Sequence, residues 1–460
     1  TVHWDQAGVV SASLSDQQLR SQYAWEQFRK QFKGPAVPKE VKKILDVERE
    51  KRTTDQQQQL TRYYIEHINP DTMAILQGPL DRKAGVERKL QEVDKAIPAT
   101  LVMEDRKKAR QAHILERGQY TEKRGPVKSA VPTWILPMAE NAPMNRMGLA
   151  QWLVDPSHPL TSRVTVNRMW QQFFGIGIVR TSEDFGVQGE QPSHPKLLDW
   201  MALRFVESGW DVKAFQKMLL MSATYRQSSR LTTAKLAADP ENRLLSCGPR
   251  FRLDGEVIRD QALAVSGLLV GRIGGKSGRP YQPDGLWKPV GFGGSNTSVF
   301  KQDHGVNLYR RSMYTFLKRT SPPPSMTTFD APNRETCQVR RSRTNTPLQA
   351  LVLMNDVQFF EAARKFAERV MTEGGQQTTS RLDWAFCTVT ARHPSPRESA
   401  MLLAMFASYQ EDFRNDREAA EKLLKAGESS RNVNLDVVDL AAWSMVTHLL
   451  LNLSETITKG

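Results

Sequence analysis

Residues 316–356 read FLKRTSPPPSMTTFDAPNRETCQVRRSRTNTPLQALVLMND. The stretch joins a three-proline run to a group of arginines and then to a clear helix start. Thr346 can cap that helix, Pro347 suits its first position, and Gln349 stands three residues after the cap, so a capping box is expected. Guanidinium groups just before a helix N-terminus favour an anion, because free N–H groups and positive charge act together there. We therefore expect an anion or partner contact at Arg334, Arg340, Arg341 and Arg343.

The same arginines also have a structural interpretation. Asp330, Glu335 and Asp356 lie close to them in the sequence and carry the charge needed for salt bridges. Such pairs would tie the Pro-rich loop to the rest of the fold, although exposed pairs add little stability. We expect a structural role first and anion or partner binding second.

The three cysteines, Cys247, Cys337 and Cys387, lie far apart in the chain. None belongs to a CxxC or CxxCH motif, so the spacing predicts neither a zinc cluster nor a covalently attached c-type haem, and no metal site is expected. Cys337 lies among the arginines, and neighbouring positive charge favours a reactive thiolate. For Cys337 we favour the alternative of a buried inert thiol or one half of a disulfide.

Length and composition limit the class of protein. The chain has 460 residues, a net charge of +14 and 39% hydrophobic residues. That length allows two or three domains with cores. No apolar run approaches the roughly 18 residues of a membrane span, so no transmembrane segment is expected. The positive charge favours anionic partners, but acids are mixed among the bases, which indicates a solvated surface more than a nucleic-acid face.

Apolar residues at helical spacing recur along most of the chain. Residues 1–144 predict a charged helical arm with a linker, and residues 145–460 predict a helical C-terminal domain. We expect helices at 14–33, 46–67, 86–97, 148–154, 162–174, 195–207, 212–223, 253–269, 355–371, 397–413 and 437–453, and a short strand within 111–118. The expected fold is mainly α: an irregular multi-helix domain with long loops and minor β, preceded by an extended helical arm.

A second group of polar residues lies in the loop before the helix at 195–207. Glu183, Asp184, Glu190 and His194 bring three acids and an imidazole into one loop, a set that could bind a metal or supply an acid and a base. Their spacing is irregular, and Ser193 or His194 stands where a helix cap belongs. Loop hydrogen bonding and capping are therefore the favoured interpretation. No GxSxG or HExxH motif is present.

Five segments together point to a family. They are NRMWQQFFGIGIVRTSEDFGVQGEQPSHPKLLDW (167–200), LLMSATYRQSS (219–229), DPENRLL (239–245), residues 310–356 and AAWSMVTHLLLNLSETI (441–457). The chain resembles, over roughly residues 145–457, the C-terminal domain of planctomycete cytochrome C domain-containing proteins. That domain is known as domain of unknown function 1553.

The resemblance carries its own expectations. It implies an exported protein of the periplasm or cell surface. It implies a c-type haem in an N-terminal domain of a larger precursor, and we expect no cofactor in this chain. The chain begins with threonine instead of methionine, which favours a piece of such a precursor. The family has no established catalytic residues, so none are carried over.

We therefore expect a non-catalytic structural or partner-binding module of an exported, cytochrome-linked protein assembly. Its expected partners are other protein chains. The first alternative is a periplasmic enzyme acting on an acidic or sulfated polysaccharide, and the second is a nucleic-acid-binding protein. An enzyme predicts a cleft where the 183–194 loop faces the arginines, whereas a scaffold predicts arginines paired with acids. Nucleic acid is the least expected partner, because basic and aromatic residues do not interleave in any known module.

Overall fold

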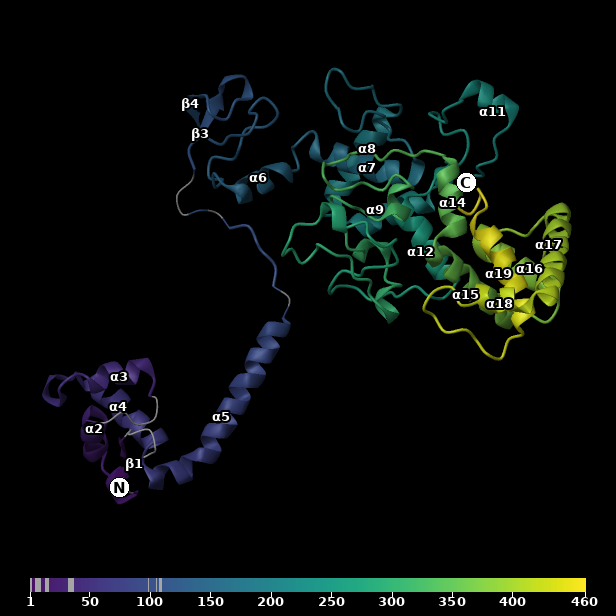
Figure 1. The fold of residues 1–460 in the computed structure, drawn as a ribbon. Helices are drawn as coiled ribbons and strands as arrows, with labels where there is room; N and C mark the ends of the chain where they lie inside the picture. Colours follow the sequence, from purple (N-terminus) through teal and green to yellow (C-terminus); the bar gives the residue numbers. More distant parts are fainter. Residues whose placement is uncertain are drawn as a thin grey trace. The chain divides into compact units, whose positions relative to one another are not determined.

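A computed structural model of the protein describes residues 2–4, 10–12, 16–31, 37–97, 99–104, 106 and 110–460. Contacts divide the chain into two compact units, residues 1–108 and residues 109–460 (Figure 1). The division concerns compactness alone, so the domain boundary predicted between residues 144 and 145 stays a prediction.

The smaller unit contains a modest apolar core and one long exposed helix. Trp25, Ile44, Leu45, Leu60 and Tyr64 form that core. It gives part of the predicted arm a compact packing that we did not expect. Residues 14, 15, 32 and 33 of the helix predicted at 14–33 lie outside the described residues. The elements of this unit are β1 (Val2–Trp4), β2 (Val10–Ala12), α1 (Asp16–Leu19), α2 (Gln22–Gln31), α3 (Lys39–Leu45), η1 (Arg49–Lys51), α4 (Thr54–His67) and α5 (Pro70–Ala96).

The long helix α5 forms the extended arm that the charge pattern predicts. Asn69 caps its first turn by accepting from the backbone N–H of Asp71, and Pro70 stands at its first position. None of its 27 residues is buried, and its tertiary contacts include α4 near its N-terminal end, where the Thr72 hydroxyl donates to the carbonyl of Ile65 at 2.6 Å. Pairs one turn apart, such as Lys83 with Glu87 at 3.8 Å, are the contacts that support an exposed helix.

The larger unit begins with a hairpin and a first group of helices. The strand expected within 111–118 is present and pairs antiparallel with a second strand. Val166, Trp170 and Phe174 recur at helical spacing on one face of α7, where the Trp170 and Phe174 rings stack at 3.8 Å. That face packs against α8 and α9. The elements are β3 (Ala112–Leu115), η2 (Glu116–Gly118), β4 (Lys123–Val127), α6 (Arg146–Leu153), α7 (Thr161–Phe174), α8 (Pro195–Glu207), α9 (Val212–Met221), α10 (Ala223–Arg226) and α11 (Thr233–Ala238).

The main core surrounds the last helix. Residues of α19 are buried on every side of the helix, as expected for a helix that is apolar all round. α15 and α17 pack directly against it, and Figure 1 shows α15 to α19 gathered in one group. The elements are α12 (Gly255–Val265), α13 (Pro324–Thr327), α14 (Pro347–Asn355), α15 (Val357–Glu373), α16 (Thr378–Thr390), α17 (Pro396–Asn415), α18 (Arg417–Leu423) and α19 (Val437–Leu451).

Long irregular segments between α12 and α14 are held by buried polar side chains. Glu361 on α15 accepts hydrogen bonds from the hydroxyls of Tyr281 and Tyr309, at 2.9 and 2.8 Å. Arg259 is 3% exposed and donates to the backbone carbonyls of Leu308 and Arg310, both at 2.7 Å. These polar contacts add to a small apolar cluster formed by Leu263, Leu308 and Tyr309. The elements are η3 (Lys288–Val290), η4 (Gly305–Asn307), η5 (Ser312–Tyr314) and the strand pair β5 (Phe251–Arg252) and β6 (Thr458–Lys459).

The mainly α fold with minor β is confirmed. Among the described residues no helix combines the length and apolar character needed to cross a membrane. Several helices escaped prediction, among them α3, α11, α16 and α18, and α5 begins at Pro70, well before the expected range of 86–97. The longest missed helix, α16, is rich in threonine and lacks a glycine at its C-terminal end, so its sequence carries neither strong helix propensity nor a clear stop.

Candidate functional site

The arginine segment, residues 334–343, folds back onto the start of α12 and onto the loop before α8. Nη1 of Arg341 lies 2.6 Å from Oε2 of Glu256, and Nε of Arg343 lies 3.9 Å from Oδ1 of Asp254. Burial lowers the pKa of the Arg341 guanidinium, but the hydrogen bond and charge of Glu256 outweigh it, so the net shift is upward. Arg341 is thus paired with Glu256, and the charge of Arg343 is balanced in part by Asp254; both acids stand about 90 residues earlier in the chain.

The other two arginines have different surroundings. Nη2 of Arg340 lies 3.7 Å from Oε1 of Glu183, which joins the arginine segment to the 183–194 loop. Arg334 adopts a left-handed backbone conformation, with φ of 62°, and lines a surface hollow beside Asp254 and Glu256. Acidic residues therefore lie within 4 Å of Arg340, Arg341 and Arg343, whereas Arg334 shares only the wall of the hollow with Asp254 and Glu256.

The acids that we expected to neutralise the arginines have other roles, so that pairing was wrong. Asp330 accepts from the backbone N–H of Thr344 at 2.7 Å. Glu335 lies 3.7 Å from Arg319. Asp356 caps α15 by accepting from the backbone N–H of Gln358. Proximity in the sequence failed because the loop reverses direction and presents its arginines to α12.

The predicted capping box at Thr346 is also absent. Thr346 does occupy the N-cap position of α14, but its side chain makes no capping hydrogen bond. Gln349 instead turns inward, is 1% exposed, and donates to the carbonyls of Thr328 and Thr344 at 3.1 and 3.2 Å. The buried amide of Gln349 thus satisfies two loop carbonyls, and it is not available to cap the helix.

Cys337 is a free, exposed thiol. The buried or disulfide-bonded alternative that we favoured for it was wrong, because the segment that carries it runs over the surface. Cys247 is also free, and it is buried.

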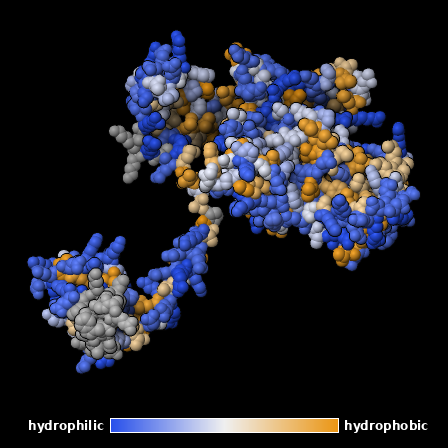
Figure 2. All heavy atoms as spheres, viewed as in Figure 1, coloured by the Kyte–Doolittle hydropathy of each residue, from blue (hydrophilic) through white to orange (hydrophobic). Residues whose placement is uncertain are grey.

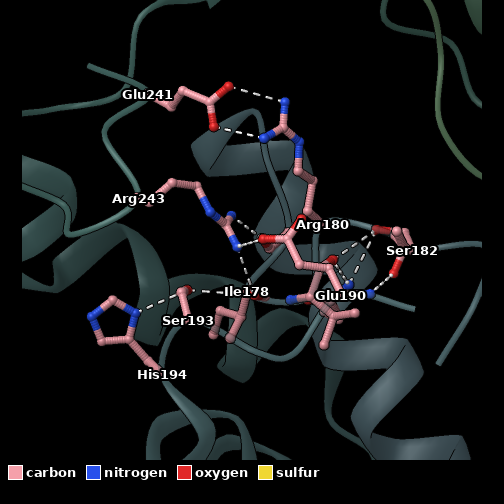
Figure 3. A network of polar contacts seen from close by, with 12 residues as sticks. Ile178, Arg180, Ser182, Glu190, Ser193, His194, Glu241 and Arg243 are labelled. Carbon is pink, nitrogen blue, oxygen red and sulfur yellow. Dashed lines mark hydrogen bonds and ion pairs between the residues drawn. The ribbon is translucent and has the colours of Figure 1, made fainter. Parts of the chain in front are cut away.

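The predicted residues of the 183–194 loop have separate partners, and Figure 3 shows those of Glu190, Ser193 and His194. Oδ1 of Asp184 accepts from the backbone N–H of Gly186 at 2.7 Å, and Oε1 of Glu190 lies 3.2 Å from Nη2 of Arg243. Nδ1 of His194 lies 3.0 Å from the hydroxyl of Ser193. Glu183, Asp184, Glu190 and His194 thus point to separate partners, which gives no common point for a metal ion.

Capping of α8 differs from expectation in a similar way. His194 stands at the N-cap position, but it makes no capping hydrogen bond. The Ser193 hydroxyl lies 3.4 Å from the carbonyl of Ile178, so it ties the loop to the segment after α7. Pro195 at the first helical position supplies the helix start without a side-chain cap.

A hollow of about 270 Å³ lies where the loop meets the arginine segment. Ser193 and His194 contribute one part of its wall, and Arg343 contributes another. Arg250 and the aromatic ring of Phe251 also line it, and the Arg343 guanidinium lies 4.2 Å from that ring. Burial lowers the pKa of Arg343. The hollow is thus a small, partly cationic site, with charge balanced in part by Asp254 beside Arg343 and by Glu241, which also lines the hollow.

The surface of α14 has an inverted pattern that sequence analysis missed. Gln349 is buried, whereas Leu348, Leu351 and Met354 are 63%, 50% and 53% exposed. These three apolar residues recur every third position and share one helix face. Helices that are apolar all round are normally buried, so α14 exposes a face that would gain from a cover. The run LVLM (351–354) was the signal in the sequence.

A groove continues from this face. The α14–α18 groove is lined by Met354, Asn355, Val357, Phe360, Ala419, Lys422, Leu423, Lys425 and Ala426. Its volume is about 580 Å³, and apolar side chains make up most of its wall. Lys422 and Lys425 have no salt bridge within the described residues and add positive charge to the wall of the groove, with Glu418 and Glu421 one helical turn before them. Figure 2 shows apolar side chains at the surface of the larger unit on the viewed face.

Comparison with known proteins identifies the family. Residues 145–406, more than half of the chain, match the model of a family described as a protein of unknown function (DUF1553). The match includes the 183–194 loop, the arginine segment and α14. No curated protein and no solved structure matches the chain. The resemblance to domain of unknown function 1553 is therefore confirmed, and the chain belongs to the DUF1553 family.

Proposed function

We propose that the protein is a non-catalytic, partner-binding module of an exported, cytochrome-linked protein assembly, and that it binds another protein chain through α14 and the α14–α18 groove. The exposed face of α14 carries the proposal. Leu348, Leu351 and Met354 are between 50% and 63% exposed. The same helix buries the polar residue Gln349. Covering apolar surface of this kind is the main favourable term in protein association.

The groove favours a partner of a particular chemistry. A ridge of apolar side chains beside a groove matches the binding of an amphipathic helix, which inserts anchors at every third or fourth position. Lys422 and Lys425 stand at the rim without acidic partners among the described residues. An acidic flank on the bound helix would complement these two lysines. The proposed occupant is therefore an amphipathic, acidic helix of another protein.

The polar groups elsewhere support a binding role over catalysis. Each acid of the 183–194 loop is engaged in a hydrogen bond or ion pair, and the arginines Arg340, Arg341 and Arg343 lie beside carboxylates. The hypothesis of a structural, partner-binding module predicts arginines that are paired with acids in this way. Export and the link to a c-type cytochrome rest on the family resemblance and belong to the same proposal.

Site-specific photo-crosslinking in the native host tests this proposal. A photo-reactive amino acid is placed at Leu351, and the matched control carries it at Ile273, which is 81% exposed on an irregular loop. We expect position 351 to crosslink to one helical, acidic segment of a single protein, and position 273 not to do so. Capture of unrelated proteins at both positions would refute the proposal.

A peptide copy of the crosslinked segment gives the quantitative test. Fluorescence anisotropy measures its affinity for the purified 460-residue chain and for variants. Leu351→Glu should weaken binding by about 30-fold, as loss of an apolar anchor does. Lys422→Glu should weaken it less and reduce its salt dependence. Equal affinity for Leu351→Glu and Ile273→Glu would exclude α14 as the docking surface.

A second function is favoured by the hollow near Arg343. His194, Arg250 and Arg343 line one small cavity, an arrangement that suits a sulfate or carboxylate group of an acidic glycan. A sulfated oligosaccharide should then bind the protein. Arg343→Gln should weaken this binding more than Arg340→Gln does, because Arg343 lines the cavity and Arg340 does not. An equal loss in both variants would indicate general attraction to the basic surface instead.

A further inference from the structure

Three side chains with metal-binding atoms converge at the end of α16. Nδ1 of His393 lies 2.7 Å from Oδ1 of Asp383 and 3.4 Å from Sγ of Cys387. All three atoms lie within 4.8 Å of one another. Asp383 and Cys387 are one helical turn apart and therefore share a face of α16. Among the described residues no other His, Cys, Asp or Glu joins this group.

The backbone after α16 is built to return His393 to that face. Ala391 ends the helix in a left-handed conformation, with φ of 57°, and donates its N–H to the carbonyl of Cys387. Arg392, the next residue, pairs with both Glu398 and Glu455, at 2.8 and 2.7 Å. These pairs fix the short loop between the helix and His393. The imidazole is thus held beside the helix face that carries the carboxylate and the thiol.

We propose that Asp383, Cys387 and His393 form a binding site for Zn²⁺, with a fourth coordination position open to solvent. Thiolate, imidazole and carboxylate are the three ligand types of protein zinc sites. For Zn–S of about 2.3 Å and Zn–N of about 2.0 Å, a tetrahedral site places sulfur and nitrogen about 3.5 Å apart. The separation of 3.4 Å between Cys387 and His393 meets that requirement.

Binding requires the carboxylate of Asp383 to adjust to its two neighbours, and its oxygen lies within 4.8 Å of Sγ of Cys387, where a tetrahedral site needs about 3.5 Å. In a tetrahedral site the imidazole nitrogen and the carboxylate oxygen would be about 3.3 Å apart, so the 2.7 Å contact between His393 and Asp383 would lengthen slightly. The ion takes the place of the thiol proton, which passes to solvent, and His393 binds through Nδ1 as the neutral tautomer that carries its proton on Nε2. Asp383 is 45% exposed and His393 is 80% exposed, so water can reach the fourth position.

The same geometry argues against a nucleophilic cysteine. In a Cys–His–Asp triad the nucleophile and the acid use different nitrogens of the imidazole. Here both Cys387 and Asp383 contact Nδ1, so the ring cannot relay a proton between them. Burial, together with the charge of Asp383, also raises the pKa of the Cys387 thiol, which opposes a reactive thiolate in the metal-free protein.

Titration of the untagged, chelator-treated 460-residue chain tests the site. We expect one high-affinity Zn²⁺ per chain by calorimetry. Co²⁺, used as a spectroscopic substitute, should give a thiolate-to-cobalt charge-transfer band and tetrahedral visible bands. Cys387→Ser should abolish the charge-transfer band, and His393→Ala should weaken Zn²⁺ binding by about ten-fold or more. Cys337→Ser is the matched control and should leave both measurements unchanged, because Cys337 is an exposed free thiol away from this group.

Thiol protection gives a second readout within the same molecule. Zn²⁺ should slow alkylation of Cys387 and leave alkylation of Cys337 unchanged, as measured by peptide mass spectrometry. This comparison needs no variant, so a folding defect cannot confuse it. Absence of the charge-transfer band, or equal alkylation of Cys387 with and without Zn²⁺, would overturn the proposal.

Discussion

The substitution Glu361→Gln should lower the free energy of unfolding of the larger unit by about 3 kcal/mol. Glu361 is fully buried and accepts from the hydroxyls of Tyr281 and Tyr309 and from the backbone N–H of Ser429, the last at 2.6 Å. Arg364, also fully buried, lies 3.9 Å away. Breaking a buried charged group's pairing costs about 3–5 kcal/mol, and glutamine keeps one acceptor, so the lower end applies.

The two tyrosines explain why charge matters at this position. Burial, followed by the influence of Glu361, raises the pKa of Tyr281 well above its ordinary value, and the same two causes raise that of Tyr309. Both hydroxyls therefore remain protonated donors to the carboxylate. Their residues belong to irregular segments far from α15 in the sequence, so Glu361 is where those segments are attached to the core.

Urea denaturation, followed by tryptophan fluorescence, measures the loss, and hydrogen exchange locates it. Exchange should rise in the segments around Tyr281, Tyr309 and Ser429 before it rises in α19. Glu411→Gln is the control, because Glu411 is an exposed glutamate on α17 and its loss should change the free energy by less than about 0.5 kcal/mol. A change that small for Glu361→Gln, with unaltered exchange, would refute the reasoning.

Three further predictions concern single contacts. Gly427→Ala should destabilise the protein by about 2 kcal/mol in thermal melts, because φ there is +82° and an added Cβ would lie 2.2 Å from a buried carboxyl carbon. Arg52→Ala should lower the free energy of unfolding of the smaller unit by about 3 kcal/mol, as measured by urea denaturation, because it leaves the buried carboxylate of Glu26 without its partner at 2.6 Å. Replacing Glu26 as well should recover part of that loss. Hydrogen bonds from Arg392 and Ser395 lower the pKa of Glu398 to about 2. The stabilising effect of the Glu398 carboxylate is therefore complete above about pH 4.5 and is lost as the pH falls towards 2. The difference in unfolding free energy between the wild type and Glu398→Gln should shrink over that range.

Helices with strong apolar periodicity could be predicted from the sequence. α7, α8 and α19 lie close to their expected ranges, because Gly175 ends α7, Pro195 starts α8 and the apolar run of α19 is continuous. The mainly α class followed from these elements. α16 could not be predicted in this way, since its threonines and weak termini hide a helix that tertiary packing stabilises.

The candidate sites were less accessible to sequence reasoning. The arginine segment was recognised, but its partners Asp254 and Glu256 come from another part of the chain, and only the folded loop brings them together. The exposed face of α14 was hidden because an apolar run is expected to be core, whereas Gln349 takes the buried position. The Asp383, Cys387 and His393 group depends on the left-handed turn at Ala391, which no spacing rule for metal ligands anticipates.

The burial of α19 has a consequence for how the chain is made. α19 is synthesised after α15 and α17, yet it fills the centre of the core that they share. Until it emerges from the ribosome, those two helices must present their apolar faces to water or to a chaperone. The family match ends at residue 406, before α18 and α19 begin, so a fragment cut at that boundary would lack its own centre and should aggregate.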